Sequence, residues 1–387
     1  MPQPTRIAAR WEAKVTEVPP YAAIGHAAAL YERGVASHDR GEYTAAEKLW
    51  RKAAEAGHSD AQFDLGALLH ERGDVDSLAQ TEELWRSAAA AGHPHAQYNL
   101  GILLHPRQDE ASVAEAEKSW RSAAHAGHAR AQYNLGCLLD DRGDDASVAE
   151  AERWWRSAAE AGHIEAANNL GVLFDERGSA QAQHWWHMAA EAGHLGAQLN
   201  LGALLYEQGD AKSAESWWRT AADAGNADAQ YNLGVLHYEH EGDEAVAEAQ
   251  KWWQMAANTG HTDAQYSLGA LLAERADPES IAEAMRWWRI AGGAGHCEAQ
   301  YSLGGQLFGH GQAGSLAEAE MWWRKAAHAG HLSAQYNLGV LLFQRGDARS
   351  LFEAQAWWRV TADAGHVSAR GNLDELAKHC PQELAQP

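Results

Sequence analysis

Histidine follows a glycine at a regular interval along this 387-residue chain. Imidazole is the commonest metal ligand in proteins, so such a series could form a ladder of metal sites. Two His bound to one zinc have nitrogens within about 4 Å of each other, whereas equivalent atoms of packed helices lie about 8–10 Å apart. Adjacent turns therefore cannot share an ion, and no metal ligand is predicted. The nine positions are His58, His93, His128, His163, His194, His261, His296, His331 and His366.

The tenth turn of this series carries Asn226 in place of histidine. Asn is a preferred N-cap residue, because its side-chain oxygen accepts a hydrogen bond from a free N–H in the first turn of a helix. What His and Asn share is a polar side chain that can cap a helix. We therefore interpret the series as helix caps, and we keep a His-rich metal-binding protein as an alternative hypothesis.

Residue patterns typical of active sites are missing from the sequence. There is no Gly-rich phosphate loop after a strand, no HExxH motif and no Ser–His–Asp neighbourhood beyond chance. The many carboxylates are interpreted as solvated faces of helices. We predict no catalytic residue, no cofactor and no enzymatic activity.

The glycines before these polar residues define the organisation of the chain. Successive differences between them are 35, 35, 35, 31, 32, 35, 35, 35 and 35 residues. A fixed period in this range indicates a stacked repeat protein, in which each copy buries its apolar face only against its neighbours. The turn glycines are Gly57, Gly92, Gly127, Gly162, Gly193, Gly225, Gly260, Gly295, Gly330 and Gly365.

Each copy is predicted to hold two helices, A and B. In one copy helix A spans Pro94–His105 and helix B spans Val113–Ala126, and Gly127 ends helix B with a left-handed cap. The distance from the second Trp of helix B to the turn Gly is always 7 residues, and from that Gly to the Gly of the next LG pair it is 9. All length variation falls between A and B. The turn from B to A is therefore expected to be the rigid joint.

The two ends of the chain depart from the repeat. A leader is expected to contain a short helix over Ile7–Val15 and to stop at Pro19 and Pro20. Terminal elements of a solenoid need a polar outer face, which the more polar last helix provides. The predicted segments are a leader (1–20), an N-terminal capping hairpin (21–57), tandem repeats (58–366) and a C-terminal capping helix with a tail (367–387).

One Trp column is present in every copy and is predicted to form the core. An indole removes roughly 150–250 Å² from water when it is buried. The preceding Trp of the doublet is replaced in the first three copies, which indicates a partly exposed or inter-repeat site. Small residues such as Gly101 and Ala123 are expected where helices approach closely. The column is Trp50, Trp85, Trp120, Trp155, Trp186, Trp218, Trp253, Trp288, Trp323 and Trp358.

Composition restricts the partners that the chain can have. A formal charge of −22 opposes binding to nucleic acid and favours neutral or basic partners. No apolar h-region follows the start, and no run of about 18 apolar residues occurs, so neither a secretory signal nor a membrane span is expected. Three cysteines without metal spacing fit a reducing compartment. We expect a cytoplasmic protein and leave its oligomeric state open.

The string AQYNLG after AGH, with WWR and AA before it, resembles the repeat of the Sel-one-like family, a branch of the tetratricopeptide superfamily. The resemblance covers about residues 40–375. It implies an all-α fold, a right-handed α-solenoid superhelix of about ten antiparallel hairpins plus a C-terminal capping helix. The A helices would line its concave face. Proteins of this kind are usually adaptors that hold peptides or assemble other proteins, and they are rarely enzymes.

The resemblance also implies a binding groove. In the wider superfamily the Asn of a YNLG-like segment often faces the groove and bonds to the ligand backbone, since an amide offers both donor and acceptor. The preceding aromatic would lie beside it. The alternative is that Asn and Tyr bond across neighbouring A helices. The implied groove residues are Tyr98, Asn99, Tyr133, Asn134, Asn169, Asn200, Tyr231, Asn232, Tyr266, Tyr301, Tyr336 and Asn337.

Two functional hypotheses follow. In the first, the chain is a non-catalytic adaptor that grips a neutral or basic protein segment in its groove. An acidic C-terminal tail is a poor ligand for the clamp known in the superfamily, because acidic residues stand where it needs Lys or Arg. In the second, the chain is a self-assembling structural or accessory subunit of a larger complex. The acidic positions are Glu71, Asp141, Glu176, Glu207, Glu239 and Glu274.

Overall fold

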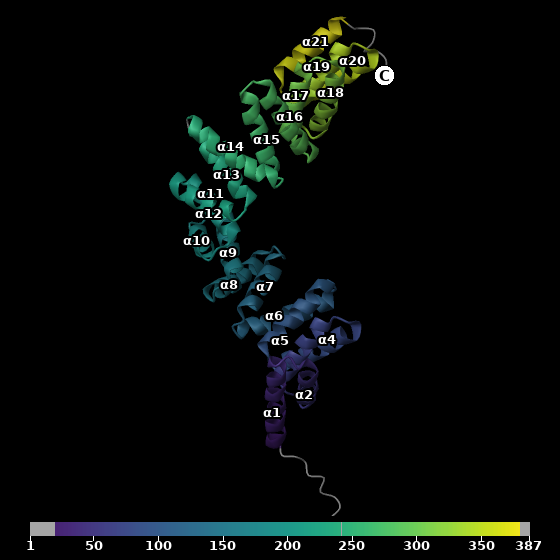
Figure 1. Ribbon diagram of the computed structural model, residues 1–387. Coiled ribbons are helices and arrows are strands. Elements are labelled where there is room, and N and C mark those ends of the chain that lie inside the picture. Colours follow the sequence, from purple (N-terminus) through teal and green to yellow (C-terminus); the bar gives the residue numbers. More distant parts are fainter. Residues whose placement is uncertain (1–19, 241, 380–387) are drawn as a thin grey trace, which may run out of the picture. The chain divides into compact units, whose positions relative to one another are not determined.

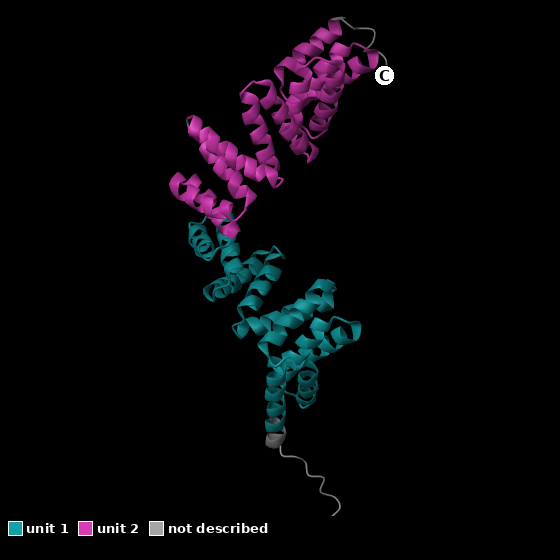
Figure 2. Cartoon of the chain, in the orientation of Figure 1, with its two compact units in different colours: residues 1–194 teal, residues 195–387 magenta. Residues whose placement is uncertain are grey.

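The computed structural model describes residues 20–240 and 242–379, and throughout them the regular elements are helices, with no β strand (Figure 1). The predicted all-α solenoid is confirmed. The chain divides into two compact units, residues 1–194 and 195–387 (Figure 2). The leader helix expected over Ile7–Val15 lies outside the described residues, as does the tail after His379.

Unit 1 contains five helix hairpins in its described part, and helices adjacent in the chain pack against each other. Odd-numbered helices are the A helices and even-numbered helices are the B helices. The bounds are α1 (Pro20–Asp39), α2 (Tyr43–Glu55), α3 (Ser59–Arg72), α4 (Val75–Ala90), α5 (Pro94–Leu104), the 3-10 turn η1 (His105–Arg107), α6 (Glu110–His125), α7 (Ala129–Asp140), α8 (Asp145–Glu160), α9 (Ile164–Glu176) and α10 (Gln181–Glu191).

Unit 2 contains five further hairpins and then a single A helix, α21, in the residues that the structure describes. The same neighbours pack together here. The bounds are α11 (Leu195–Glu207), α12 (Ala211–Asp223), α13 (Ala227–Tyr238), α14 (Asp243–Asn258), α15 (Thr262–Glu274), α16 (Pro278–Gly293), α17 (Cys297–Gly309), α18 (Ala313–His328), α19 (Leu332–Arg345), α20 (Ala348–Asp363) and α21 (Val367–His379).

Helix ends in the copy between Pro94 and Gly127 differ slightly from those that the sequence predicts. Helix A ends at Leu104 and continues as one 3-10 turn, since Pro106 has no N–H to donate. Helix B begins at Glu110 rather than at Val113, because the Asp109 carboxylate accepts from the Ser112 N–H and starts the helix earlier. Similar Asp caps begin other B helices, including Asp74, Asp144 and Asp347.

The predicted Trp column forms the core of each hairpin. All ten indoles are buried, with at most 4% of the residue exposed. In eight hairpins the indole N–H donates to a main-chain carbonyl of helix A at 3.1–3.3 Å, as Trp323 does to Tyr301. The apolar ring and its polar N–H are thus both accommodated inside the hairpin.

The second residue of each LG pair must be glycine, because the indole lies directly on the backbone of helix A. A Cβ added to Gly304 would lie 2.5 Å from two atoms of the Trp323 ring, and the other copies are equally tight. Such a distance requires one of the helices to move. In α21, the last helix that the structure describes, Asp374 occupies the equivalent position. The close approach that the sequence predicts is therefore confirmed and has one specific cause.

The first Trp of the doublet packs between copies. Trp185, Trp252 and Trp322 are buried, whereas Trp154 and Trp357 are half-buried. The indole N–H of Trp154, Trp322 and Trp357 donates to a glutamate four residues earlier at 3.1–3.3 Å. The side chain is thus held by a neighbouring carboxylate on its own helix.

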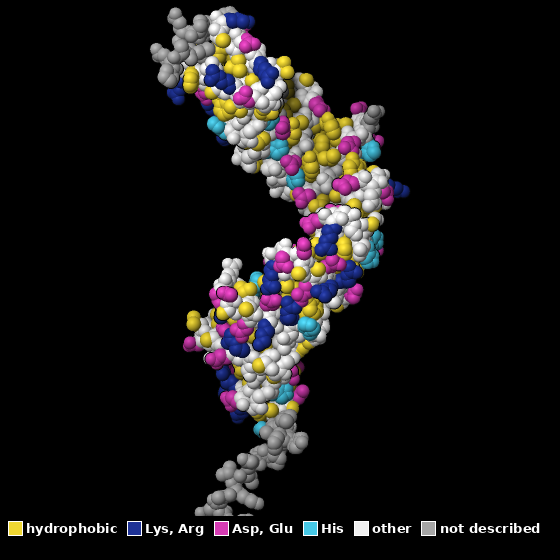
Figure 3. Space-filling model, turned by 180° about the vertical axis from the view of Figure 1, so that it is seen from behind, with side chains coloured by type: hydrophobic (Ala, Val, Ile, Leu, Met, Phe, Trp, Pro, Cys, Tyr) yellow, Lys and Arg dark blue, Asp and Glu magenta, His cyan; other side chains and the backbone are white. Residues whose placement is uncertain are grey.

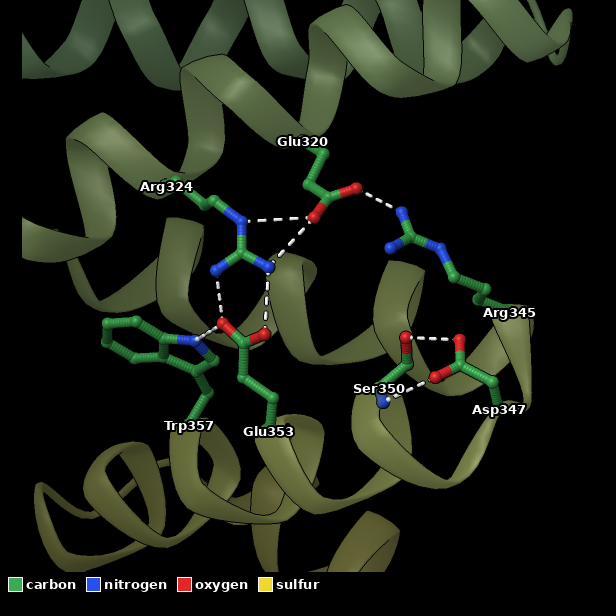
Figure 4. A network of polar contacts seen from close by, with 7 residues as sticks. All are labelled: Glu320, Arg324, Arg345, Asp347, Ser350, Glu353 and Trp357. Carbon is green, nitrogen blue, oxygen red and sulfur yellow. Dashed lines mark hydrogen bonds and ion pairs between the residues drawn. The ribbon is translucent and has the colours of Figure 1, made fainter.

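An ion-pair ladder joins successive B helices. On α18, Nη2 of Arg324 lies 2.8 Å from Oε1 of Glu320, and Arg324 also pairs with Glu353 of α20. Glu320 pairs in addition with Arg345 at the end of α19 (Figure 4). The Glu353 carboxylate also accepts from the Trp357 indole at 3.2 Å. One network therefore ties together three consecutive helices.

The same arrangement recurs in unit 1. A glutamate of helix B pairs with the arginine four residues later and with the arginine that follows or ends the next helix A. Figure 3 shows acidic and basic side chains interspersed on one face of the molecule. An isolated exposed ion pair contributes about 0–1 kcal/mol to the stability of a protein, and ion pairs joined in a network contribute more. The groups are Glu47 with Arg51 and Arg72, Glu82 with Arg86 and Arg107, Glu117 with Arg121 and Arg142, and Glu152 with Arg156 and Arg177.

The Gly–Trp contact predicts opposite effects for two adjacent glycines of α17. Gly304→Ala places its Cβ against Trp323 and is expected to destabilise the protein by about 1–3 kcal/mol. Gly305→Ala meets no atom within 4 Å and is expected to stabilise the helix by about 0.5–1 kcal/mol. Urea unfolding followed by Trp fluorescence measures both. Equal shifts for the two variants would contradict the role given to the indole.

The ladder predicts a pH-dependent loss of stability. The hydrogen bond from Arg324 lowers the pKa of Glu353. Burial alone would raise the pKa of Glu320, but the hydrogen bonds from Arg345 and Arg324 outweigh burial, so that this pKa is also lowered. Stability from a lowered pKa is fully present above the unfolded value, about 4.3, and is lost as pH falls through the folded value. Arg324→Met should therefore lower stability by about 1 kcal/mol at neutral pH, and the deficit should shrink below about pH 4.

The control for this variant is Arg359→Met. Arg359 holds the same repeat position on α20, but the uncharged Gln355 stands where Glu320 stands on α18, and Arg359 makes no ion pair within the described residues. Its replacement should leave the pH profile of unfolding unchanged. A pH-independent deficit for Arg324→Met would show that packing, and not the carboxylates, carries the effect.

Candidate functional site

Each A helix begins directly after the turn that follows the preceding helix B. Each turn Gly has a positive φ, between 82° and 103°. Residues with a side chain rarely adopt this backbone conformation, so glycine is favoured there. The next side chain caps helix A: His296 Nδ1, for example, accepts from the Ala299 N–H at 3.1 Å. The cap predicted from the sequence is confirmed in most copies, and His163 lacks it. The capping residues are His58, His93, His128, Asn226, His261, His296 and His331.

A buried glutamine completes the same joint, and the sequence alone did not single it out. Its amide Nε2 donates to a carbonyl in the last turn of the preceding helix B, as Gln335 does to Ala327 at 3.0 Å. The last carbonyls of a helix have no partner within the helix, so this bond satisfies one of them. The glutamines are Gln62, Gln97, Gln132, Gln230, Gln265, Gln300 and Gln335.

The aromatic residue of the YNLG segment stacks on the turn His of the next copy. Ring centroids are 4.4–4.9 Å apart and the planes differ by 19–24°. One face of each predicted groove aromatic is therefore covered by the neighbouring repeat. The pairs within the described residues are Tyr31–His58, Phe63–His93, Tyr98–His128, Tyr133–His163, Tyr231–His261, Tyr266–His296, Tyr301–His331 and Tyr336–His366.

The residues of the Asn column divide into two groups. Asp64, which replaces Asn in its copy, accepts from the Tyr31 hydroxyl at 3.0 Å, and Asn372 donates to the Tyr336 hydroxyl at 3.3 Å. These are the contacts across neighbouring A helices that were the alternative to groove binding. Asn99 and Asn134, in contrast, are half-buried and have no hydrogen-bond partner within the described chain. Their amides remain available to a ligand.

Two adjoining depressions lie along α5, α7 and α9 in unit 1, and they share Tyr98 and Arg130. The first has a volume of about 550 Å³ and is lined by Phe63, His95, Tyr98, Asn99, Gly127, His128, Ala129 and Arg130. The second has a volume of about 540 Å³ and is lined by Tyr98, Arg130, Tyr133, Asn134, Gly162, His163, Ile164 and Glu165. Four residues of the predicted groove are thus brought together at one surface.

The other predicted groove residues are spread along the chain. Asn169 lines a smaller depression of about 190 Å³ beside Trp155 and Glu176, and Asn232 lines another of about 190 Å³ beside Tyr206. Asn200 and Asn337 are half-buried, and Tyr231, Tyr266, Tyr301 and Tyr336 stack on turn His residues as Tyr98 and Tyr133 do, but none of these six residues lines either of the two larger depressions. The arrangement favours unit 1 as the place of a site.

The second residue of helix A contacts the next copy, and the sequence analysis missed this position. An acidic side chain here lies 3.0–3.2 Å from Nε2 of the next turn His: Asp60 with His93, Asp228 with His261, Asp263 with His296 and Glu298 with His331. Because Nδ1 of these rings accepts from a main-chain N–H, a neutral ring carries its proton on Nε2 and donates to the carboxylate. The signal was available in the sequence as the third residue after each turn Gly.

The acidic pattern is not complete: Gly196 and Ser333 take this position in α11 and α19, and two successive copies carry basic side chains there. His95 and Arg130 occupy the position in α5 and α7. His95 Nδ1 lies 3.1 Å from His128 Nε2, so an imidazole accepts there instead of a carboxylate. Burial lowers the pKa of His128, and the nearby His95 and Arg130 lower that pKa further. This part of the A-helix face therefore carries one permanent positive charge, that of Arg130, in a chain of net charge −22.

Clusters of three or more His, Cys, Asp or Glu side chains placed to hold a metal ion do not occur among the described residues. Across the same residues, none of the helices has the length and apolar character needed to cross a bilayer.

The Sel1 repeat model matches the chain ten times in succession, almost without a gap. The matched ranges are 20–58, 59–93, 94–128, 129–163, 164–194, 196–226, 227–261, 262–296, 297–331 and 332–366. The chain belongs to the Sel1 repeat family. Sel1 repeat proteins are generally protein-interaction scaffolds and are typically not enzymes. The first match, 20–58, includes the hairpin that the sequence analysis predicted as a cap.

Solved Sel1-type structures resemble this one over most of their length. A protective antigen of uropathogenic Escherichia coli with an SLR fold is 29% identical, with a TM-score of 0.72 over 93% of this chain and 81% of that one. A Sel1 repeat protein from Oxalobacter formigenes is 26% identical, with a TM-score of 0.60 over 80% of this chain and 93% of that one. Among curated proteins no similar sequence is found.

Proposed function

We propose that this Sel1 repeat protein is a non-catalytic scaffold that binds an extended protein segment along α5, α7 and α9. The observation that supports the proposal is the pair of adjoining depressions in unit 1, lined by Tyr98, Asn99, Tyr133 and Asn134. A concave surface with aromatic walls and a few polar groups is the usual form of a peptide or ligand site.

The spacing of the two free amides suits an extended peptide. Asn99 and Asn134 stand on neighbouring A helices, and packed helices lie about 8–10 Å apart. An extended chain advances about 3.3 Å per residue, so one amide meets every third residue of the ligand. Each amide offers a donor and an acceptor to the main chain of the ligand. Such hydrogen bonds do not depend on the side chains of the peptide, so they set no strict sequence preference. Side chains between these contacts would meet Tyr98 and Tyr133.

The net charge of −22 favours a partner that is neutral or basic overall. Exposed charge acts mainly on the rate of encounter and is weakened by salt. The partner is therefore expected to bind faster at low ionic strength, while the depressions determine which segment stays bound.

A peptide-display selection tests this proposal. Peptides selected on the wild-type protein should bind the double variant Asn99→Ala/Asn134→Ala about 5- to 100-fold more weakly, since each lost hydrogen bond costs about 0.5–1.5 kcal/mol. Fluorescence anisotropy of labelled peptides measures the change. Because neither amide has an internal partner in the described chain, the variant should unfold at the wild-type temperature.

Asn337→Ala is the matched control, because Asn337 holds the same repeat position and is also half-buried, but in unit 2. It should bind the selected peptides as wild type does. Equal affinity of all three proteins would remove these depressions as the binding site.

Self-association is a second candidate function, and one observation favours it. Met255, Ile290 and Val360 hold the same outward position on α14, α16 and α20, two residues after the buried Trp, and are 38–52% exposed. Apolar side chains repeated on one face of a solenoid are suited to contact with another protein surface.

This alternative predicts that Ile290→Glu dissociates an assembly. Light scattering over a wide concentration range should show a mass that rises with concentration for wild type and stays constant for the variant. Gly293→Glu, placed near the end of the same helix α16, serves as the charge control. A wild-type protein that stays monomeric at all concentrations would contradict self-association.

A further inference from the structure

Arg130 places a positive charge where four other A helices present a carboxylate to the next turn His. In four joints a carboxylate accepts from His Nε2 at 3.0–3.2 Å. In the joint between α7 and α9 that carboxylate is replaced by a guanidinium, which cannot accept a hydrogen bond. His163 also lacks the usual cap, and its Nδ1 lies 3.3 Å from a carboxylate oxygen of Glu165 of its own helix. The joint therefore has a permanent positive charge in place of the carboxylate found in those four joints.

A chain of hydrogen bonds directs a second donor to the same surface. His128 Nδ1 accepts from the Ala131 N–H at 3.2 Å, so a neutral His128 carries its proton on Nε2. That proton is donated to His95 Nδ1 at 3.1 Å. A neutral His95 then carries its own proton on Nε2, and His95 is exposed. The first depression therefore contains an imidazole N–H donor whose tautomer is fixed by the fold.

Arg130 itself is available for binding. Its side chain is exposed, lines both depressions and has no ion-pair or hydrogen-bond partner within the described residues. The first depression has no carboxylate in its lining, and in the second the one carboxylate, Glu165, lies beside His163. A guanidinium presents two parallel N–H groups that match the two oxygens of a carboxylate.

We propose that the depressions beside Arg130 bind the side-chain carboxylate of an Asp or Glu in the bound segment, with Arg130 and His95 as its donors. The inference rests on the proposed function and names the chemistry that the segment must carry at one point. A segment that is neutral or basic overall, with a single acidic side chain facing Arg130, satisfies both the net charge of the protein and this local reversal.

A carboxylate fits these donors better than a phosphate or a nucleic acid. The depressions contain one permanent positive charge, that of Arg130, together with the imidazoles of His95, His128 and His163. Recognition of phosphate groups uses clusters of Arg, and nucleic acid needs a basic stripe along the molecule. One guanidinium with one additional N–H donor matches the charge and the oxygens of a single carboxylate.

The test is a peptide-display selection on the full chain, followed by binding of the selected peptides to Arg130→Glu. This variant should remain folded, because Glu is the residue type that accepts from the turn His in another copy, Glu298 with His331. The control is Arg153→Glu, an exposed arginine of α8 that lines neither depression.

The expected result has three parts. Selected peptides share an Asp or Glu at one position; Arg130→Glu weakens their binding about ten-fold or more, as loss of a charge-assisted hydrogen bond predicts; and Arg153→Glu does not. Peptides remade with Gln in place of Glu should bind wild type about as weakly and should lose little further affinity with Arg130→Glu. This double-variant comparison isolates the contact between the two charges.

Two results would overturn the inference, and they are distinguishable. Selected peptides that are sensitive to Asn99→Ala/Asn134→Ala but carry no shared acidic residue, and that bind Arg130→Glu as well as wild type, would end the role of Arg130 and leave the proposed function intact. If no peptides are selected, or if those selected ignore both sets of substitutions, the proposed function and this inference fail together.

Discussion

The contact between the helix B indole and the bare backbone of helix A is the constraint on which the other contacts depend. The ring lies where a Cβ on the LG glycine would be, at 2.2–2.7 Å in the copies from Gly66 to Gly339. Its N–H reaches the carbonyl of the aromatic residue three positions before that glycine, as Trp323 reaches Tyr301. The same Tyr places its ring on the turn His of the next copy. One residue of helix A thus connects the core of its own hairpin to the neighbouring hairpin, and within each unit this makes the stack a continuous chain of contacts.

Polar contacts divide the surface into two kinds of ladder. Along the B helices, Arg and Glu pair both within a helix and across copies, as Arg324 does with Glu320 of its own helix and with Glu353 of the next copy. Along the starts of the A helices, a turn His is held between a main-chain N–H and a carboxylate of the preceding copy. Where a copy substitutes the carboxylate, as at Arg130, the fold is retained because the Trp core does not depend on it. The surface can therefore change its charge at one joint without change in the architecture.

The helical repeat and its joints follow from the sequence, because period and residue type are local information. The repeat spacing and the buried Trp column are found in the structure where the sequence predicts them, and the polar cap after the turn glycine is found in most copies. The start of α6 at Glu110 was missed because the Asp109 cap acts before the first apolar residue of the helix. The structure divides the Asn column, since Asp64 and Asn372 bond to tyrosines of the preceding copy whereas the predicted groove residues Asn99 and Asn134 do not.

By itself the sequence determined that the chain is a stack of helical hairpins, because each copy repeats the apolar and turn residues that a hairpin needs. Only the tertiary structure decided which polar residues bond to a neighbouring copy and which stay free to bind a ligand. The Tyr–His stacks and the His–carboxylate bonds join residues about thirty positions apart, one copy to the next. Distances across a packed joint depend on how two helices lie against each other, and no spacing along one chain specifies them. For that reason the depressions around Tyr98 and Arg130 emerge only when neighbouring copies are assembled.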